Sequence, residues 1–323
     1  MKKLFVLFVG ILMWSGLAMG QEKLSVGLVM SSGGLGTGFN QMAYEALTKL
    51  EQEGSIDFKY VEPVNVSEDL DYLRDFSGSG EYDLIIAMGS VVAESLKEVV
   101  KNYPEQRYAL IGATLELHNT ITVDFAEHEM SFMAGSLAAM MSENNKVGTI
   151  PAMDTKSFNR FKNGFRQGAQ YVNKDVKVYN TYMPTTSSNP FNDPVTGKNI
   201  SQLMIDRGVD VIMHIAEGSG RGLFEAAKAN GTYAIGCDVD EDGEVPGTIL
   251  TSVRVRIDNA VYNIVSDVMA GDFQPGYKMA GLAEGAVSLT DFNYTRDAIG
   301  EERLAKLQKI EEDIIAGKIK ISQ

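Results

Sequence analysis

The chain of 323 residues is poor in the side chains that form cross-links and bind metals. It has one cysteine, Cys237, and three histidines, His118, His128 and His214. A single cysteine excludes an intramolecular disulfide, so stability must come from a hydrophobic core, and we expect Cys237 to be a small buried apolar residue. The histidines are few and scattered, and His128 lacks the second histidine that a zinc helix places four residues later. No metal site is therefore expected.

Motifs that carry catalysis or bind phosphate are also missing. The glycines between positions 33 and 38 are not followed by Gly-Lys-Ser/Thr, and Phe39 stands where a dinucleotide fingerprint needs its third glycine. Gly218-Ser219-Gly220 offers no Gly-x-Ser-x-Gly frame for a serine nucleophile. The sequence thus supplies no catalytic set, and we expect neither an enzyme nor a bound cofactor.

The chain has little positive charge. It carries 29 basic and 43 acidic residues, a net charge of −14. A nucleic-acid partner requires a basic surface, and so does binding to anionic lipid. The balance argues against both, and a solubilising surface charge is sufficient to explain it.

A cluster of acidic residues follows one apolar run. Asp238-Val239-Asp240-Glu241-Asp242-Gly243 resembles the first half of a calcium loop, but the closing position is Ile249 and strands, not helices, are expected on both sides. Asp238 alone is the better candidate, because it ends a strand where a carboxylate can accept hydrogen bonds from ligand hydroxyls. Residues 241–244 are expected to form an acidic surface loop.

The N-terminus contains the one markedly apolar run outside the expected core. Lys2-Lys3, an apolar stretch from Leu4 to Trp14, and Ala18-Met19-Gly20 have the layout of a secretory signal peptide, with cleavage expected after Gly20. The stretch is too short to span a bilayer, and no cysteine lies there for lipid attachment. Residues 1–20 are therefore expected to be removed, leaving an exported, soluble protein.

The rest of the chain alternates apolar strands with helices, which predicts α/β lobes built on parallel sheets. The alternation is interrupted by a polar strand at 120–124 and then starts again, so we expect two Rossmann-like lobes. The last segments should cross back and leave three linking strands with a cleft between the lobes. The expected N-terminal lobe is 21–122 plus 254–276, and the C-terminal lobe is 123–253 plus 277–323. A single large doubly wound sheet is the alternative.

Two loops stand out as candidate parts of a ligand site. Strand 24–30 leads into a Gly/Ser segment and then a helix, with Phe39 and Asn40 at the loop exit. Gly218 lies in a second glycine-rich loop, which follows strand 209–215 in the other series. Loops at the carboxyl ends of parallel strands are where α/β proteins hold small molecules, and an aromatic ring beside an amide suits a flat polar ligand.

Several segments together resemble the basic membrane protein family of ABC-transporter substrate-binding proteins, best known for purine nucleoside receptors. They occur in family order and cover nearly the whole chain after residue 20. They are Gly33-Gly34 with Phe39-Asn40-Gln41, His128 to Gly135, Lys146-Val147-Gly148, Phe161 to Phe165, Val172-Asn173, Gly208 to Ile212, Gly218-Ser219-Gly220 with Ala226-Ala227-Lys228, Ile235 to Asp240, and Leu250-Thr251-Ser252 with Asp258 to Val261.

This resemblance implies the type I periplasmic binding protein fold and a monomeric periplasmic receptor that delivers its ligand to an ABC permease. It implies that Phe39 stacks on a base, that Asn40 hydrogen-bonds the ring edge, and that Asp238 binds ribose hydroxyls. Further expected residues of the ligand cleft are Gly89, Asp124 and Gly218.

The chain departs from the family pattern at two places. Leu35-Gly36-Thr37-Gly38 replaces a longer, charged segment, and Val255 stands where the family has a lysine. Arg254 and Arg256 flank that position, but strand alternation points them the other way. Riboflavin or another aromatic polyol is therefore the alternative ligand. From a different class, a nucleoside-processing hydrolase is the rival, and the missing catalytic set speaks against it.

Overall fold

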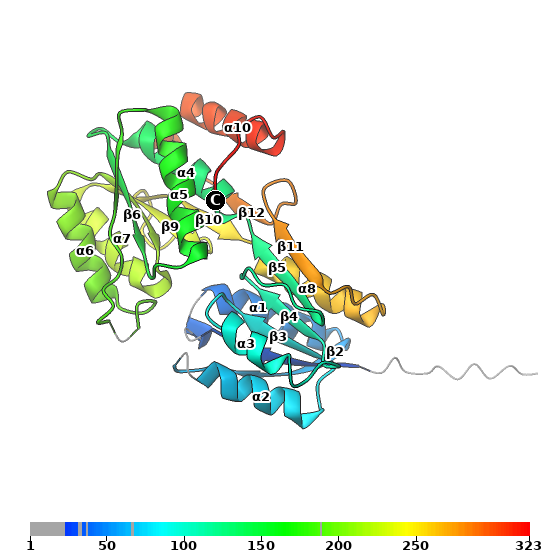
Figure 1. The fold of residues 1–323 in the computed structure, drawn as a ribbon. Coiled ribbons are helices and arrows are strands. Elements are labelled where there is room, and N and C mark those ends of the chain that lie inside the picture. The colour runs from blue at the N-terminus through cyan, green and yellow to red at the C-terminus, as the bar shows by residue number, and fades with distance from the viewer. Residues whose placement is uncertain (1–22, 32–33, 37, 66–67, 188) are drawn as a thin grey trace, which may run out of the picture.

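The computed structural model describes residues 23–323 apart from 32–33, 37, 66–67 and 188. The expected signal peptide, residues 1–20, lies outside the described residues. Figure 1 shows two lobes, with the first strands of the chain in the lower lobe and the middle of the chain in the upper one. Within the described residues each lobe contains one sheet of six strands, so the chain has two sheets and not one large one.

The sheet of the N-terminal lobe is parallel throughout, in the order β11-β5-β4-β3-β1-β2. Its strands are β1 (Leu24–Val29), β2 (Ile56–Val61), β3 (Leu84–Met88), β4 (Tyr108–Ile111), β5 (Thr120–Phe125) and β11 (Gly276–Ala280). Its helices are α1 (Gly38–Gln52), α2 (Asp69–Ser79), α3 (Ala93–Val99) and α8 (Ile257–Met269).

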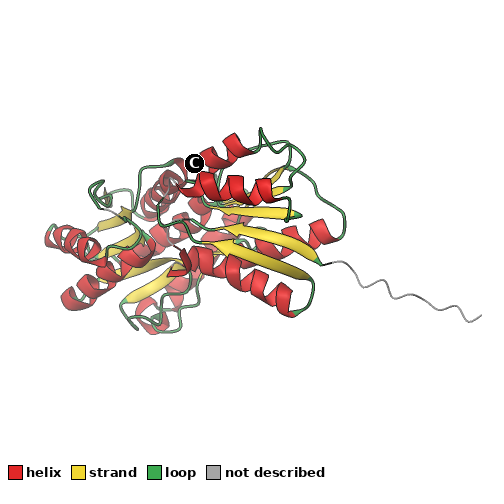
Figure 2. Ribbon diagram, turned by 90° about the horizontal axis from the view of Figure 1, so that it is seen from below, coloured by secondary structure: helices red, strands yellow, loops and turns green. Residues whose placement is uncertain are grey.

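Helices cover both faces of this sheet (Figure 2). Successive side chains of β3 point to opposite faces, so Ile85 and Ala87 join the core under α2 and α3, while Leu84, Ile86 and Met88 join the core under α1 and α8. All five are fully buried. This burial on both faces explains why β3 is a continuous apolar run in the sequence.

The sheet of the C-terminal lobe has the order β12-β10-β9-β8-β6-β7, with β12 antiparallel to β10. Its strands are β6 (Lys146–Pro151), β7 (Lys177–Asn180), β8 (Val211–Ile215), β9 (Tyr233–Asp238), β10 (Ile249–Val255) and β12 (Val287–Leu289). The helices of this part of the chain are α4 (Glu127–Met141), α5 (Lys156–Val172), α6 (Pro194–Asp206), α7 (Gly220–Asn230), α9 (Arg296–Ile299) and α10 (Glu301–Ile315).

The described chain crosses between the lobes three times, as expected: from β5 to α4, from β10 to α8 and from β11 to β12. The crossings lie later than the predicted boundaries. Residues 123–125 and 277–280 complete strands of the N-terminal sheet, whereas the prediction assigned them to the C-terminal lobe. The polar composition of β5 concealed its role, because Thr120, Thr122 and Asp124 are buried in spite of their polarity.

Helices α4 and α5 pack with their backbones in close contact. A Cβ atom on Gly135 of α4 would lie 2.7 Å from the carbonyl carbon of Phe165. On α5, a Cβ on Gly168 would lie 2.7 Å from the carbonyl carbon of Phe132, and one on Gly164 would lie 2.7 Å from the Cα of His128. Distances below 3 Å are not tolerated, so these three positions require glycine. The beginning of α5 is thereby held at the cleft.

Candidate functional site

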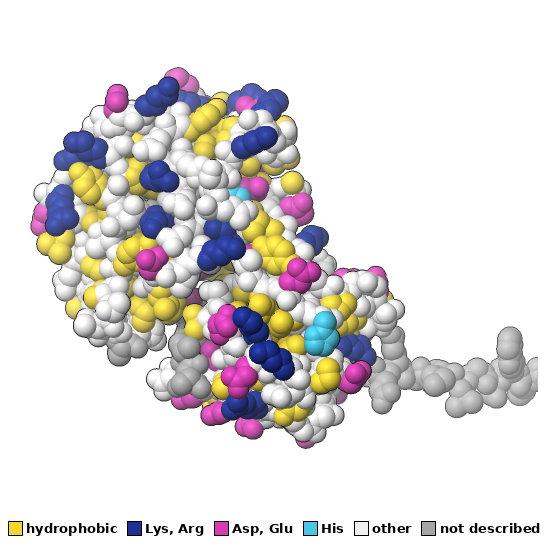
Figure 3. All heavy atoms as spheres, in the orientation of Figure 1, with side chains coloured by type: hydrophobic (Ala, Val, Ile, Leu, Met, Phe, Trp, Pro, Cys, Tyr) yellow, Lys and Arg dark blue, Asp and Glu magenta, His cyan; other side chains and the backbone are white. Residues whose placement is uncertain are grey.

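A cavity lies between the lobes, at the carboxyl ends of their parallel strands. The space between its walls amounts to about 820 Å³, including the part that is open to solvent. Figure 3 shows charged side chains of both signs scattered over the visible face of both lobes. The cavity wall, in contrast, contains five phenylalanines. They come from both lobes and are Phe39, Phe125, Phe158, Phe161 and Phe191.

Phe39, in the first turn of α1, lies against the ends of β3 and β4. Gly89 and Gly112, which follow these strands, have positive φ angles of 88° and 76°. A Cβ atom on Gly112 would lie 2.7 Å from Cζ of Phe39, and one on Gly89 would lie 3.9 Å from Cε1. The glycines therefore provide both a left-handed turn and the space for the ring. Phe39 and Gly89 both line the cavity.

The side chain of Asn40 is directed into its own loop. Its Oδ1 accepts hydrogen bonds from the backbone N and Oγ of Ser31, and its Nδ2 donates to the carbonyls of Ser31 and Gly34. Asn40 is fully buried and is not among the described residues that line the cavity. In this structure the amide ties the first turn of α1, which carries Phe39, to Ser31 and Gly34.

Asp238 lies across the cavity from Phe39, at the end of β9, and has a positive φ of 70°. Burial raises its pKa to about 6, although the Cys237 side chain and the charge of His214 oppose the shift. Gly218 is separate from the main cavity. It lines a smaller pocket beside it, which also includes Asp238.

The acidic loop after Asp238 is partly buried, in contrast to the surface loop expected from the sequence. Glu241 is 8 % exposed; its Oε2 lies 2.7 Å from Nε2 of His214 and accepts a hydrogen bond from the backbone N of Cys237. Asp242 is 3 % exposed and accepts hydrogen bonds from Ser252 and Thr290. These side chains anchor the turn that carries Asp238, and periodicity could not distinguish them from a solvated acidic run.

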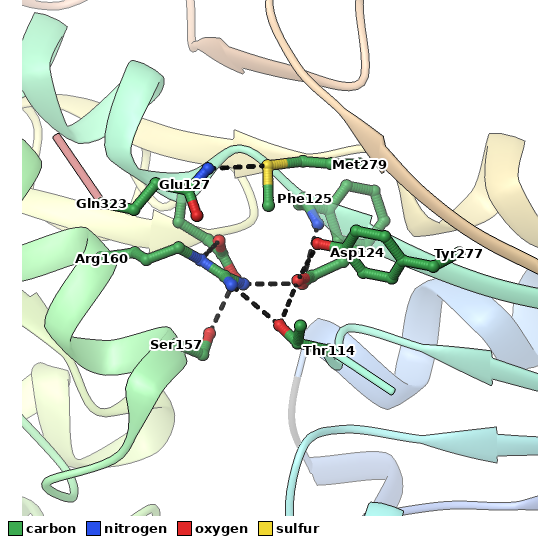
Figure 4. A network of polar contacts seen from close by, with 9 residues as sticks. All are labelled: Thr114, Asp124, Phe125, Glu127, Ser157, Arg160, Tyr277, Met279 and Gln323. Carbon is green, nitrogen blue, oxygen red and sulfur yellow. Dashed lines mark hydrogen bonds and ion pairs between the residues drawn. The ribbon is translucent and has the colours of Figure 1, made fainter. Parts of the chain in front are cut away.

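Asp124 does not line the cavity in the described residues; it belongs to a buried network at the crossing between lobes (Figure 4). Its Oδ1 accepts a hydrogen bond from Nη2 of Arg160 at 2.7 Å, and its Oδ2 accepts from Thr114 and Tyr277. Arg160, on α5, also donates to Thr114 and to both oxygens of Glu127. The network thus joins both lobes through one guanidinium group.

Glu127 connects this network to the cavity, because it lines the cavity wall and accepts hydrogen bonds from Arg160 and Ser157. Burial raises the pKa of Glu127 to about 7, while Arg160 and Ser157 oppose the shift. Sequence reasoning missed Arg160 and Glu127 as well as Phe158. The available signal was their position in the first turns of α4 and α5, next to the carboxyl ends of β5 and β6.

The residue at the family lysine position also faces the ligand space. Val255, at the end of β10, lines the cavity, whereas Arg256 is directed away and pairs with Asp258. Among the described lining residues there is no lysine, arginine or histidine. The charged groups of the wall are carboxylates, on Glu127, Glu217 and Asp238.

Metal binding finds no support in the described part of the chain. No cluster of three or more His, Cys, Asp or Glu side chains in it has the arrangement of a metal site. Within the same residues, no helix is long and apolar enough to cross a membrane.

Two α/β lobes joined by three crossings, with a cavity between the carboxyl ends of their strands, define a solute-binding protein of the type I periplasmic binding protein fold. A solute-binding protein of an ABC transporter system from Aeropyrum pernix K1 superposes with a TM-score of 0.82 and 29 % identity, covering 92 % of each chain. The family profile described as "ABC transporter substrate-binding protein PnrA-like" matches residues 23–323. The chain therefore belongs to this basic membrane protein (Bmp) family and, as predicted, is a binding protein and not an enzyme.

Two bacterial proteins are similar to this chain along most of their length. The CD4+ T-cell-stimulating antigen of Listeria monocytogenes is 29 % identical, over 94 % of this chain and 89 % of the relative. Basic membrane protein B of Borreliella burgdorferi is also 29 % identical, over 90 % of this chain and 89 % of the relative. The resemblance carried by the sequence motifs is thereby confirmed for the family and the fold.

Proposed function

We propose that this protein is a periplasmic receptor that binds a purine nucleoside-like ligand between its lobes and delivers it to an ABC permease. The observation that carries the proposal is the cavity itself, in which the ring of Phe39 comes from one lobe and the carboxylate of Asp238 from the other. An aromatic face opposite an acceptor matches a molecule with a flat ring at one end and hydroxyl groups at the other.

Each end of such a ligand has a partner in the wall. Stacking of a base on Phe39 contributes about 1–3 kcal/mol by the usual cost of removing an aromatic platform. The carboxylate of Asp238 can accept hydrogen bonds from two neighbouring hydroxyls, and its burial means that an analogue without them leaves an unpaired acceptor. The pair of contacts therefore selects for a ring and a polyol together.

The charge of the wall supports an uncharged ligand. The charged side chains among the described lining residues are carboxylates, and Val255 presents an apolar surface. A phosphate ester would meet these carboxylates without a compensating cation, which is unfavourable in a desolvated site. We therefore assign a free nucleoside, and not a nucleotide, to the cavity.

The cellular location and the oligomeric state are proposed from the sequence. The signal peptide expected at residues 1–20 sends the protein to the periplasm, where we propose that it acts as a monomer. The proposed route of the ligand is closure of the lobes, docking on the permease and release, as in other hinged receptors.

The direct test is to purify the processed protein from cells, release its ligand with acid and record the absorption spectrum. A purine spectrum supports the proposal, and a yellow flavin spectrum supports the alternative, riboflavin. Binding of added nucleoside should be followed by calorimetry, since Trp14, the one tryptophan, leaves with the signal peptide. Turnover of the nucleoside, or absence of any aromatic ligand, would overturn the proposal.

A further inference from the structure

The lobes touch through a glycine that lines the smaller pocket beside the cavity. Gly38, the first residue of α1, lies in the N-terminal lobe, and Val239, directly after β9, lies in the C-terminal lobe. A Cβ atom on Gly38 would lie 3.2 Å from Cβ of Val239, 2.9 Å from its Cγ2 and closer still to Cγ1. The side chain of Val239 therefore occupies the space that any larger residue at position 38 would need.

This contact is adjacent in the chain to the proposed ligand contacts on both sides. Gly38 precedes Phe39, and Val239 follows Asp238. We propose that Gly38 is a positioning residue for binding: the missing side chain lets the lobes approach until Val239 rests on the start of α1, and this sets the separation of Phe39 and Asp238. The inference rests on the proposed function, in which the ligand is held between those two residues.

Neither side of the contact can move aside easily. On one side, the hydrogen bonds of Asn40 tie the first turn of α1 to Ser31 and Gly34. On the other side, the backbone N of Val239 donates to the carbonyl of Cys237, and Glu241 accepts from the backbone N of Cys237. Because both backbones are anchored, an added methyl group is relieved most readily by separating the lobes.

A substitution at Gly38 should leave the N-terminal lobe folded. Gly38 is the first residue of helix α1, and alanine is favoured over glycine in a helix. A weaker affinity of Gly38→Ala would then report the position of the lobes and not local unfolding.

The experiment is a double-mutant cycle with adenosine as the probe, measured by calorimetry, and with riboflavin as a second probe. Gly38→Ala should bind about 10- to 100-fold more weakly at an unchanged melting temperature, as expected for overpacking of a rigid contact. Val239→Ala in the same chain should restore the affinity to that of Val239→Ala alone. The control is Gly243→Ala, an exposed position at which a Cβ meets Tyr294 Oη at an ordinary 3.6 Å.

A ligand-independent measurement separates this inference from the choice of ligand. Gly38→Cys with Val239→Cys should form a disulfide on oxidation, because their Cβ atoms would lie close to the separation of about 3.5–4.5 Å found in disulfides. Cys237 will not interfere, since it is buried and its pKa is raised. If the cross-link forms but neither probe binds, the ligand assignment fails and the contact stands. The inference is overturned if no cross-link forms, if Gly38→Ala binds like the unaltered protein, or if Val239→Ala gives no rescue.

Discussion

Nη2 of Arg160 lies 2.7 Å from Oδ1 of Asp124, and this ion pair joins the C-terminal lobe to the N-terminal lobe behind the ligand cavity. Both side chains are buried, Arg160 at 1 % and Asp124 at 0 % exposure. Among the described residues, the lobes also meet through Gly38 and Val239, which line the smaller pocket beside the cavity.

Removing Arg160 should destabilise the protein strongly. Arg160→Met leaves Asp124 and Glu127 buried without their cation, and removing one partner of a buried pair costs about 3–5 kcal/mol. Urea unfolding measures the loss. The matched control is Lys198→Met, which removes the exposed pair with Glu225 and should change the unfolding free energy by at most about 1 kcal/mol. Equal effects of the two substitutions would contradict the role given to the network.

Phe39→Ala should weaken nucleoside binding by about 1–3 kcal/mol, the range for loss of one stacking partner. Calorimetric titration with adenosine measures this change. Phe58→Ala provides the control, since Phe58 packs with Tyr44 and Tyr60 outside the cavity. An unchanged affinity in Phe39→Ala would show that the base does not stack on this ring.

Asn40→Ala should lower both stability and affinity, because the amide ties the first turn of α1, which carries Phe39, to Ser31 and Gly34. The substitution removes the hydrogen bonds of the amide to Ser31 and Gly34, and a typical hydrogen bond contributes about 0.5–1.5 kcal/mol to stability. Gln41→Ala, which removes an exposed hydrogen bond to Glu45, is the control. Reduced affinity at an unchanged melting temperature would instead favour the ring-reading role that the family resemblance implies.

Affinity should fall as the pH is lowered through the pKa of Asp238, which burial raises to about 6. The ionised carboxylate accepts the hydroxyls, so protonation removes the acceptor, and binding at pH 5 should be about tenfold weaker than at pH 7. Asp238→Asn should bind weakly with a flat pH profile. The stability of the ligand-free protein should change with pH in the opposite direction. Because folding raises the pKa of this carboxyl group, protonation favours the folded state at low pH. This contribution is lost as the pH rises from about 4 to 6.

The His214–Glu241 pair should make a pH-dependent contribution to stability. Burial opposes protonation of His214, but the charge of Glu241 and the hydrogen bond to it raise the pKa above its ordinary value of 6.5. The contribution is therefore fully present below pH 6.5 and lost as pH rises through the folded-state pKa. Glu241→Gln, which keeps an acceptor for Cys237, should lower the melting temperature more at pH 6 than at pH 9. An equal loss at both values would show that His214 is neutral throughout.

The elements that the sequence predicted well are those in which one strong pattern decides the structure. The apolar run at 84–88 had to be buried on both faces, and the repetition of strand and helix gave two lobes with three crossings. The sequence did not predict strand β12, because three residues, Val287–Leu289, are too short to show a period.

The candidate site was less accessible to sequence reasoning. Gly89 and Asp238 lie at the carboxyl ends of strands, and Phe39 lies on the helix that follows β1. The carboxyl ends of parallel strands meet at one edge of a sheet, and all three residues line one cavity. The orientations of Asn40, Asp124 and Glu241 depend on partners far away in the chain or on the exact path of a loop. For example, Asp124 faces Arg160, 36 residues later, and no local pattern relates the two.

The backbone contact between α4 and α5 implies an uneven tolerance to mutation. Saturation mutagenesis should find Gly135, Gly164 and Gly168 almost invariant, because every larger side chain collides with main-chain atoms that cannot yield. Phe158 and Phe161, on α5, line the cavity and are not part of that backbone contact. Substitutions in the cavity wall could therefore change the ligand specificity while the contact between α4 and α5 stays the same.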